Sequence, residues 1–174
     1  MPVSTVPQAG LTNPLTLATA QNSTSGTSID FTGIPSWVKR VTVMFDGVST
    51  NSTSYVQVQL GTSGGIQTTS YLSQASWTGA STGTGGPVTS GFVLDAGGPS
   101  APALRYGTIV FNVLNSSTGL WVGSSVTAMN IGGATYSFMC GGSKTLSGTL
   151  DRVRITTVNG TDTFDAGSIN ILYE

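Results

Sequence analysis

The stretch "DFTGIPSWVKRVTVMFDGVSTNSTSYVQVQLG", from Asp30 to Gly61, decides the fold class of this chain. In "YVQVQL", Val56, Val58 and Leu60 share one side, while the tyrosine and the two glutamines take the other. The earlier run "VKRVTVMF" alternates in the same way. Period-two alternation is typical of strands that pack on one face and meet water on the other. The stretch therefore predicts two strands joined by a polar turn.

The same alternation recurs along the chain, and no window of a dozen residues carries an apolar stripe at helical spacing. The composition also disfavours helix, with 24 glycines, 23 serines and 27 threonines. Short strands separated by glycine-rich turns predict an all-β fold, an antiparallel β-sandwich of jelly-roll-like kind. We expect strands at about 15–20, 27–32, 37–46, 54–61, 89–95, 106–114, 120–130, 134–140, 150–158 and 167–173.

Two regions depart from this pattern. Residues 1–26 are rich in Ser, Thr, Pro and Gln, and form either a first edge strand or an N-terminal arm that orders on a partner. The sandwich domain then spans 27–174. Residues 73–103 are rich in Gly and Pro and are expected to form a long loop with one short strand near Phe92. Loops of this length are usually functional or mobile.

Charge is scarce. Only 7% of the residues are charged, against roughly 25% in an average soluble protein, and the net charge is −1. Neutralising phosphates needs clustered cations, so nucleic acid is not expected as a partner. No apolar run is long enough to insert into a membrane, and the N-terminus does not resemble a secretory signal. The single cysteine, Cys140, excludes an internal disulfide and is expected to be a buried, inert thiol.

The sequence offers little catalytic chemistry. It contains no histidine, which rules out Ser–His and Cys–His catalysis. A pair of aspartates across two loops stays open, but most of the six aspartates are expected to cap turns. Asp162 and Asp165 in "NGTDTFDAG" do not match the spacing of a calcium loop. We therefore expect no enzyme activity, no metal and no cofactor.

Aromatic and basic residues are the remaining candidates. Tyr71 and Trp77 lie in or beside the 73–103 region and could stack on a sugar face or anchor an interface; for Trp77, core packing is an equal alternative. Trp121, like Phe111 and Phe138, is expected in the core. The adjacent cations Lys39 and Arg40 are expected to mark an exposed strand face or a subunit boundary.

The opening stretch also carries a resemblance. The segment from Ile29 to Ser73, whose most specific part is the phrase "FTGIPSWVKRVTV", and the C-terminal "RVRITTVNGTDTFDAGSINILYE" resemble segments of structural and tail-fibre-like proteins of tailed bacteriophages and prophages. The two segments together cover roughly 40% of the chain. The resemblance implies a β-sandwich virion part that is made in the host cytoplasm and assembles in several copies. By analogy with fibres, a homotrimer is expected. It implies no shared catalytic motif.

These observations favour a tail-fibre- or spike-like virion protein, multimeric, whose loops bind the host surface. Its expected partners are copies of itself, other virion proteins docked through the N-terminal arm, and a host cell-surface glycan. Two alternatives remain open. One is a decoration protein on the capsid surface, and the other is a stand-alone carbohydrate-binding module.

Overall fold

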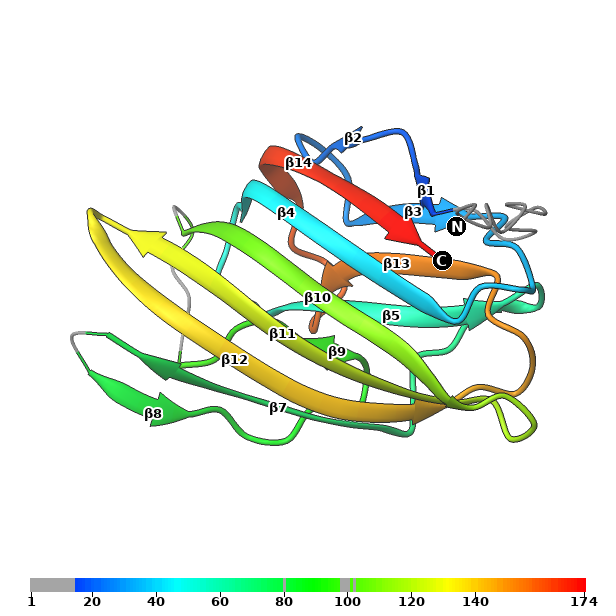
Figure 1. Cartoon of the computed structure of the whole chain (residues 1–174). Coiled ribbons are helices and arrows are strands. Elements are labelled where there is room, and N and C mark those ends of the chain that lie inside the picture. Colours follow the sequence, from blue (N-terminus) through cyan, green and yellow to red (C-terminus); the bar gives the residue numbers. More distant parts are fainter. Residues whose placement is uncertain (1–14, 80, 98–100, 102) are drawn as a thin grey trace, which may run out of the picture.

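The computed structural model describes residues 15–79, 81–97, 101 and 103–174, and this part of the chain consists of strands and turns (Figure 1). The strands form two antiparallel sheets that face each other, so the predicted all-β class and antiparallel sandwich are confirmed. Within the described ranges there is no helix with the length and apolar character that a membrane crossing needs.

The larger sheet has nine strands in its described part, and its long members run side by side across the front of Figure 1. In spatial order it contains β1 (Thr16–Leu17), β14 (Phe164–Tyr173), β4 (Arg40–Thr50), β10 (Leu104–Asn115), β11 (Leu120–Ile131), β12 (Ala134–Thr145), β7 (Tyr71–Thr78) and β8 (Thr82–Thr84), with β2 (Gln21–Asn22) also paired to β14.

The smaller sheet packs behind it. Its order is β3 (Ser28–Thr32), β13 (Arg152–Thr157), β5 (Val56–Thr62) and β6 (Gly65–Ile66), with β9 (Phe92–Val93) also paired to β5. The segment 88–95, which contains β9, connects the two sheets, and we call it the connecting segment. It bonds to β7 of the large sheet through Val88 and to β5 of the small sheet through Val93.

The core lies between the two sheets. Val41 and Val43 of β4 and Phe111 of β10 point inward from the large sheet, and Val58 of β5 and Ile155 of β13 point inward from the small one. All five are fully buried. Burying a side chain of this size contributes roughly 1.5–3 kcal/mol. The period-two alternation in the sequence thus correctly identified the faces that pack together.

The other face of β5 differs from the sequence expectation. Alternation predicts that Gln57 and Gln59 meet water, whereas both are buried. The connecting segment covers them: Ser90 Oγ donates to Gln57 Oε1 (2.7 Å), and Gln59 Nε2 donates to the Ser90 carbonyl (2.9 Å). β5 is therefore buried on both faces because the chain folds back over it.

Residues 73–103 contain more strand than expected, and the prediction of a single short strand there is wrong. Strand β7 continues to Thr78 and pairs with β12 over eight residues, from Tyr71 to Thr78. Its inward positions include the small residues Ser73 and Ala75, both buried. Small inward residues give no apolar alternation, which explains why the sequence pattern missed this strand.

The predicted first edge strand is present in part. Thr16 and Leu17 pair with the C-terminal end of β14, and Gln21 and Asn22 pair with the same strand further along. Residues 1–14 of the predicted arm lie outside the described residues. Two short strands thus extend the edge of the large sheet within residues 15–26.

Candidate functional site

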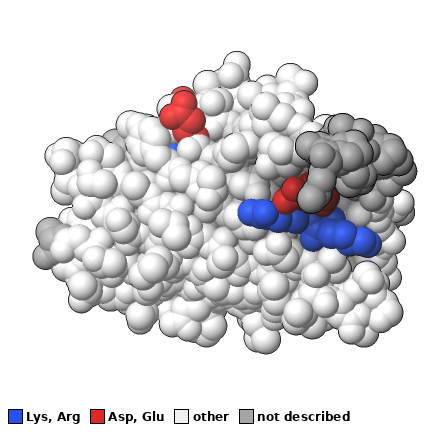
Figure 2. Space-filling model, in the orientation of Figure 1, with Lys and Arg blue, Asp and Glu red and all other residues white. Residues whose placement is uncertain are grey.

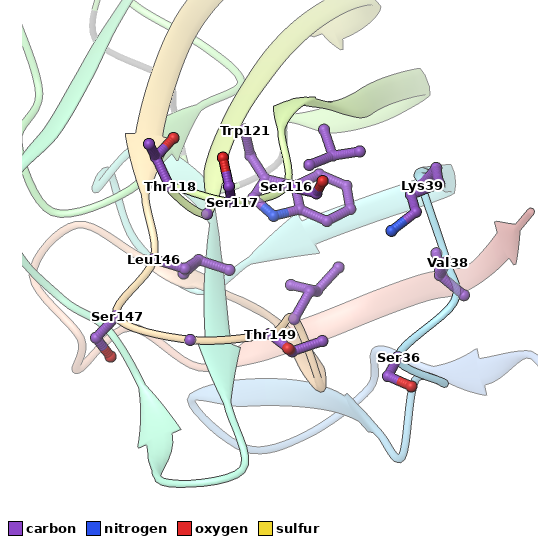
Figure 3. Close-up of a pocket in the computed structure, with 14 residues that line it drawn as sticks. Ser36, Val38, Lys39, Ser116, Ser117, Thr118, Trp121, Leu146, Ser147 and Thr149 are labelled. Atoms are coloured by element: carbon purple, nitrogen blue, oxygen red, sulfur yellow. The ribbon is translucent and has the colours of Figure 1, made fainter.

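A pocket of about 240 Å³ opens at the end of the sandwich where β10 turns into β11 (Figure 3). Its walls are the turn at 116–119, the segment 146–150 that leaves β12, and the residues that precede β4. Hydroxyl groups dominate the lining, which includes Ser36, Ser116, Ser117, Thr118, Ser147 and Thr149. The pocket is therefore rich in groups that both donate and accept hydrogen bonds.

The turn at 116–119 is held by the side chain of Asn115. Its Oδ1 accepts hydrogen bonds from Ser117 N (3.0 Å), Ser117 Oγ (2.7 Å) and Thr118 N (3.2 Å). Gly119 follows with a φ of +70°, in the left-handed region that favours glycine. Its carbonyl accepts from Leu146 N (2.9 Å), which ties the turn to the opposite wall. The shape of the pocket is thus set by local turn chemistry.

Trp121 forms the floor of the pocket. Its side chain is buried among core residues, as the sequence predicted, but its indole ring also lines the pocket. The indole N–H donates to no acceptor among the described residues, and Figure 3 shows the ring lying across the pocket near Ser117 and Leu146. An indole in this position offers a ligand one hydrogen-bond donor on an otherwise apolar surface.

Lys39 stands at the rim. Figure 3 shows its ammonium group directed across the pocket toward Trp121. The side chain forms no ion pair within the described part of the chain, although the backbone N–H of Lys39 donates to the Glu174 carbonyl (2.7 Å). Its neighbour Arg40 instead pairs with the Glu174 carboxylate (3.0 Å). The two adjacent cations thus have different environments, and only Lys39 lines the pocket.

A second hollow of about 470 Å³ adjoins the pocket. Ser36 and the residues 147–150 line both spaces, and the second adds the hydroxyl groups of Thr62 and Ser63 and the carboxylate of Asp151. We call the two together the end groove. Asp151 is paired with Arg152 (2.7 Å), so one end of the groove carries a neutralised pair. Lys39 adds a positive charge at the other end.

Tyr71, expected as a loop aromatic, is a core residue. It lies in β7 with 1% of its surface exposed and packs edge-on against Phe92 (5.4 Å between ring centroids). Its hydroxyl accepts a hydrogen bond from Leu60 N (2.8 Å) and donates to the Gln67 carbonyl (2.8 Å). Burial raises the pKa of Tyr71 to about 12. A side chain enclosed in this way cannot stack on a ligand.

Trp77 lies in β7 and is half-buried, away from the end groove. Its ring lies against Gly83 and Gly97, where an added Cβ would overlap it. It lines a separate hollow of about 190 Å³ with Tyr136 and Phe138. The structure therefore does not bring Tyr71, Trp77 and Lys39 into one site.

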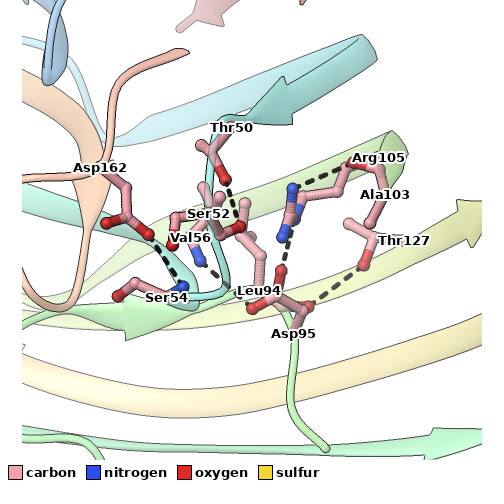
Figure 4. Close-up of polar contacts among 10 residues, drawn as sticks. All are labelled: Thr50, Ser52, Ser54, Val56, Leu94, Asp95, Ala103, Arg105, Thr127 and Asp162. Atoms are coloured by element: carbon pink, nitrogen blue, oxygen red, sulfur yellow. Dashed lines mark hydrogen bonds and ion pairs between the residues drawn. The ribbon is translucent and has the colours of Figure 1, made fainter. Parts of the chain in front are cut away.

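Most of the carboxylates, with Asp46 as the exception among the described residues, are engaged with neighbouring groups. Asp95 forms an ion pair with Arg105, and each is at most 2% exposed (Figure 4). Burial raises the pKa of the Asp95 carboxyl, while the Arg105 charge opposes the rise. Asp30 binds Arg154 through both carboxylate oxygens (2.7 Å each). Across the described residues, no three acidic or cysteine side chains gather in a way that could hold a metal ion.

Sequence reasoning placed Trp121 in the core and missed its contribution to the groove. A usable signal was present: "NSSTGLW" (115–121) and "KTLSGTL" (144–150) are both turns with several hydroxyl groups. That they face each other follows from the β11–β12 pairing, in which Leu120 lies opposite Thr145. Cys140, in contrast, is buried as predicted, and burial raises the pKa of its thiol.

Comparisons of the chain with known protein families, with curated proteins and with solved structures gave no match.

Proposed function

We propose that this chain is a bacteriophage virion structural protein, a tail-fibre- or spike-like sandwich present in several copies, which binds a host-surface glycan in the end groove. The resemblance of "FTGIPSWVKRVTV" supports the virion assignment. The observation that carries the binding part is the groove itself, a long hollow lined by hydroxyl groups with the Trp121 indole on its floor.

The chemistry of the groove matches a saccharide better than other ligand classes. Sugars present many hydroxyl groups, each of which can exchange hydrogen bonds with serine, threonine or bridging water. Trp121 and Leu146 are only 3% and 4% exposed, so they close the bottom of the groove and leave sugar recognition to the hydroxyl groups of its walls. Lys39 adds an attraction for acidic sugars. Several weakly binding copies on one particle would raise the overall affinity, because later contacts form at high effective concentration.

The test is binding of the full chain to an array of bacterial capsule and O-antigen oligosaccharides, followed by calorimetry on the ligands found. Thr149→Trp fills the groove and is expected to abolish binding. Thr161→Trp is the matched control, because Thr161 is also exposed and follows β13, whereas Thr149 precedes it. Lys39→Glu is expected to weaken the binding of acidic oligosaccharides only. Equal binding by Thr149→Trp and wild type would contradict the proposal.

The virion assignment has its own test, which is location of the chain in an intact particle by electron microscopy. A position on the head would favour the alternative of a capsid decoration protein. Glycan binding by a chain that is monomeric and absent from particles would favour a stand-alone carbohydrate-binding module instead.

A further inference from the structure

The outward face of the large sheet carries no charged side chain over four neighbouring strands, β10, β11, β12 and β7. The charged residues of these strands are Arg105 and Lys144, and both are buried on the inner side. The outward positions hold hydroxyl, amide and apolar side chains. Figure 2 shows this broad uncharged field, with basic residues gathered on one side of it. We call it the neutral face.

Large apolar side chains are exposed at the centre of the neutral face. Val126 of β11 and Met139 of β12 lie directly opposite each other in the sheet register, and they are 67% and 51% exposed. Leu72 of β7, on the same face, is 72% exposed. Val126 and Met139 are neighbours on this surface, while Leu72 lies four residues further along, opposite Ser143. Large apolar side chains that stay exposed beside each other mark an interaction surface.

Strand β4 borders the neutral face and carries opposite charges at its two ends. Its outward side chains run from Arg40 through Thr42 and Met44 to Asp46. Asp46 is exposed and forms no ion pair or side-chain hydrogen bond with any described residue. Arg40 pairs with Glu174 through Nη1 alone (3.0 Å), so its other guanidinium nitrogens can meet a second carboxylate. The border of the face thus has a guanidinium at one end and an exposed carboxylate at the other.

We propose that two copies of this chain associate face to face through the neutral face, about a two-fold axis that runs across the strands. The axis crosses β4 midway between Arg40 and Asp46. It passes close to Val126, because Val126 lies in the same cross-strand row as Met44 of β4. That row also contains Thr108 and Met139. Rotation about it exchanges the ends of β4. Asp46 of each copy then lies beside Arg40 of the other, and the apolar centres meet.

A second copy is the partner that this surface fits best. A neutral face can meet itself without repulsion between like charges, and its hydroxyl and amide groups supply both donors and acceptors. A charged partner would instead bury charges that find no counterpart on the face. The two ends of β4 complement each other only in the two-fold arrangement, which is the usual symmetry of paired subunits. The inference rests on the proposed function only for assembly in several copies, and not for glycan binding. It puts a two-fold dimer in place of the homotrimer expected by analogy with fibres.

The test is sedimentation velocity of the full chain between 1 and about 100 μM, on the wild type and three variants. Val126→Lys is expected to weaken association at least tenfold, because it places two charges near the axis. Asp46→Lys is expected to weaken it severalfold by placing two cations side by side. Val158→Lys is the control, since Val158 is exposed outside the neutral face and should leave association unchanged. Thermal unfolding of each variant confirms that it folds.

A dimer that Val126→Lys dissociates and Val158→Lys does not would support the inference. A wild-type monomer at the highest concentration would overturn it, as would a trimer or an assembly that Val126→Lys leaves intact. These outcomes do not depend on Thr149→Trp, whose effect on glycan binding tests the groove separately.

Discussion

Asp95 and Arg105 form a buried ion pair that connects three parts of the sandwich. Asp95 lies just after β9, and its Oδ1 also accepts a hydrogen bond from Val56 N of β5 (3.2 Å), while Arg105 belongs to β10 of the large sheet. The adjacent Leu94 carbonyl accepts from Thr127 Oγ1 of β11 (3.3 Å), as Figure 4 shows. Polar contacts thus fix the connecting segment to both sheets.

Removing one partner of this pair should be costly. Asp95→Ala leaves the Arg105 guanidinium buried without its counter-ion, and should lower the free energy of unfolding by about 3–5 kcal/mol. Urea unfolding measures the change. The double variant Asp95→Leu with Arg105→Met removes both charges and should be less destabilised than Asp95→Ala. An equal or larger loss in the double variant would show that the pair acts through packing instead.

Tyr71 should make the protein sensitive to alkaline pH. Its pKa of about 12 lies above the ordinary value of 10.0, so the folded state holds the phenol proton more tightly than the unfolded state does. The resulting stability is fully present below pH 10 and is lost as the pH rises toward 12, by about 1.4 kcal/mol per pH unit. Comparing urea unfolding of wild type and Tyr71→Phe from pH 8 to 11 isolates this contribution. Parallel pH curves for the two proteins would count against it.

Replacing two neighbouring glycines of β12 with alanine should affect the stability of the fold very differently. A Cβ on Gly142 points inward and overlaps the Leu72 carbonyl oxygen, which belongs to the paired strand and cannot move freely. Gly142→Ala should therefore destabilise the fold by about 1–3 kcal/mol, as overpacking does. Gly141 faces outward with nothing within 4 Å, so Gly141→Ala should leave stability nearly unchanged. Thermal melts of the two variants provide the comparison, and similar melting temperatures would refute it.

Asn115 should couple the turn at 116–119 to ligand binding. Asn115→Ala removes the acceptor of three hydrogen bonds and should cost about 1 kcal/mol. It should also weaken glycan binding severalfold, because Ser117 and Thr118 lose their fixed positions. Asn115→Asp keeps the acceptor oxygen and should retain both properties. Calorimetry measures the glycan affinity of both variants. If Asn115→Ala and Asn115→Asp bind the glycan equally well, the turn does not contribute to the binding site.

The sequence predicted the sandwich because its central strands alternate clearly. Val41, Val43 and Val58 could be assigned to the inner face from period alone, and the structure confirms each. The same rule failed for Gln57, because period two does not reveal a segment that crosses over a sheet. It also failed for β7, where Ser73 and Ala75 give inward positions no apolar signature. Strand pairing with β12, a contact distant in sequence, specifies that strand.

The candidate site was less predictable than the fold. Lys39 is exposed, but the groove it borders is assembled from turns about 110 residues apart, which only the strand order brings together. Tyr71 was misplaced because an aromatic residue beside a glycine-rich segment has the same pattern whether it is buried or exposed. Nothing in the sequence indicated the ion pair between Asp95 and Arg105, because it is a tertiary contact.

The pairing of Thr16 with Tyr173 has a mechanical consequence. Tension applied between residue 16 and residue 174 would load the hydrogen bonds of β1 one after another, since the two strands are antiparallel and their pulled ends adjoin. Bonds loaded in sequence break at lower force than bonds loaded together in shear. The edge strands should therefore peel away first and extend the tether while the sandwich stays intact, which force spectroscopy on a molecule held at these two positions would record as a small early step.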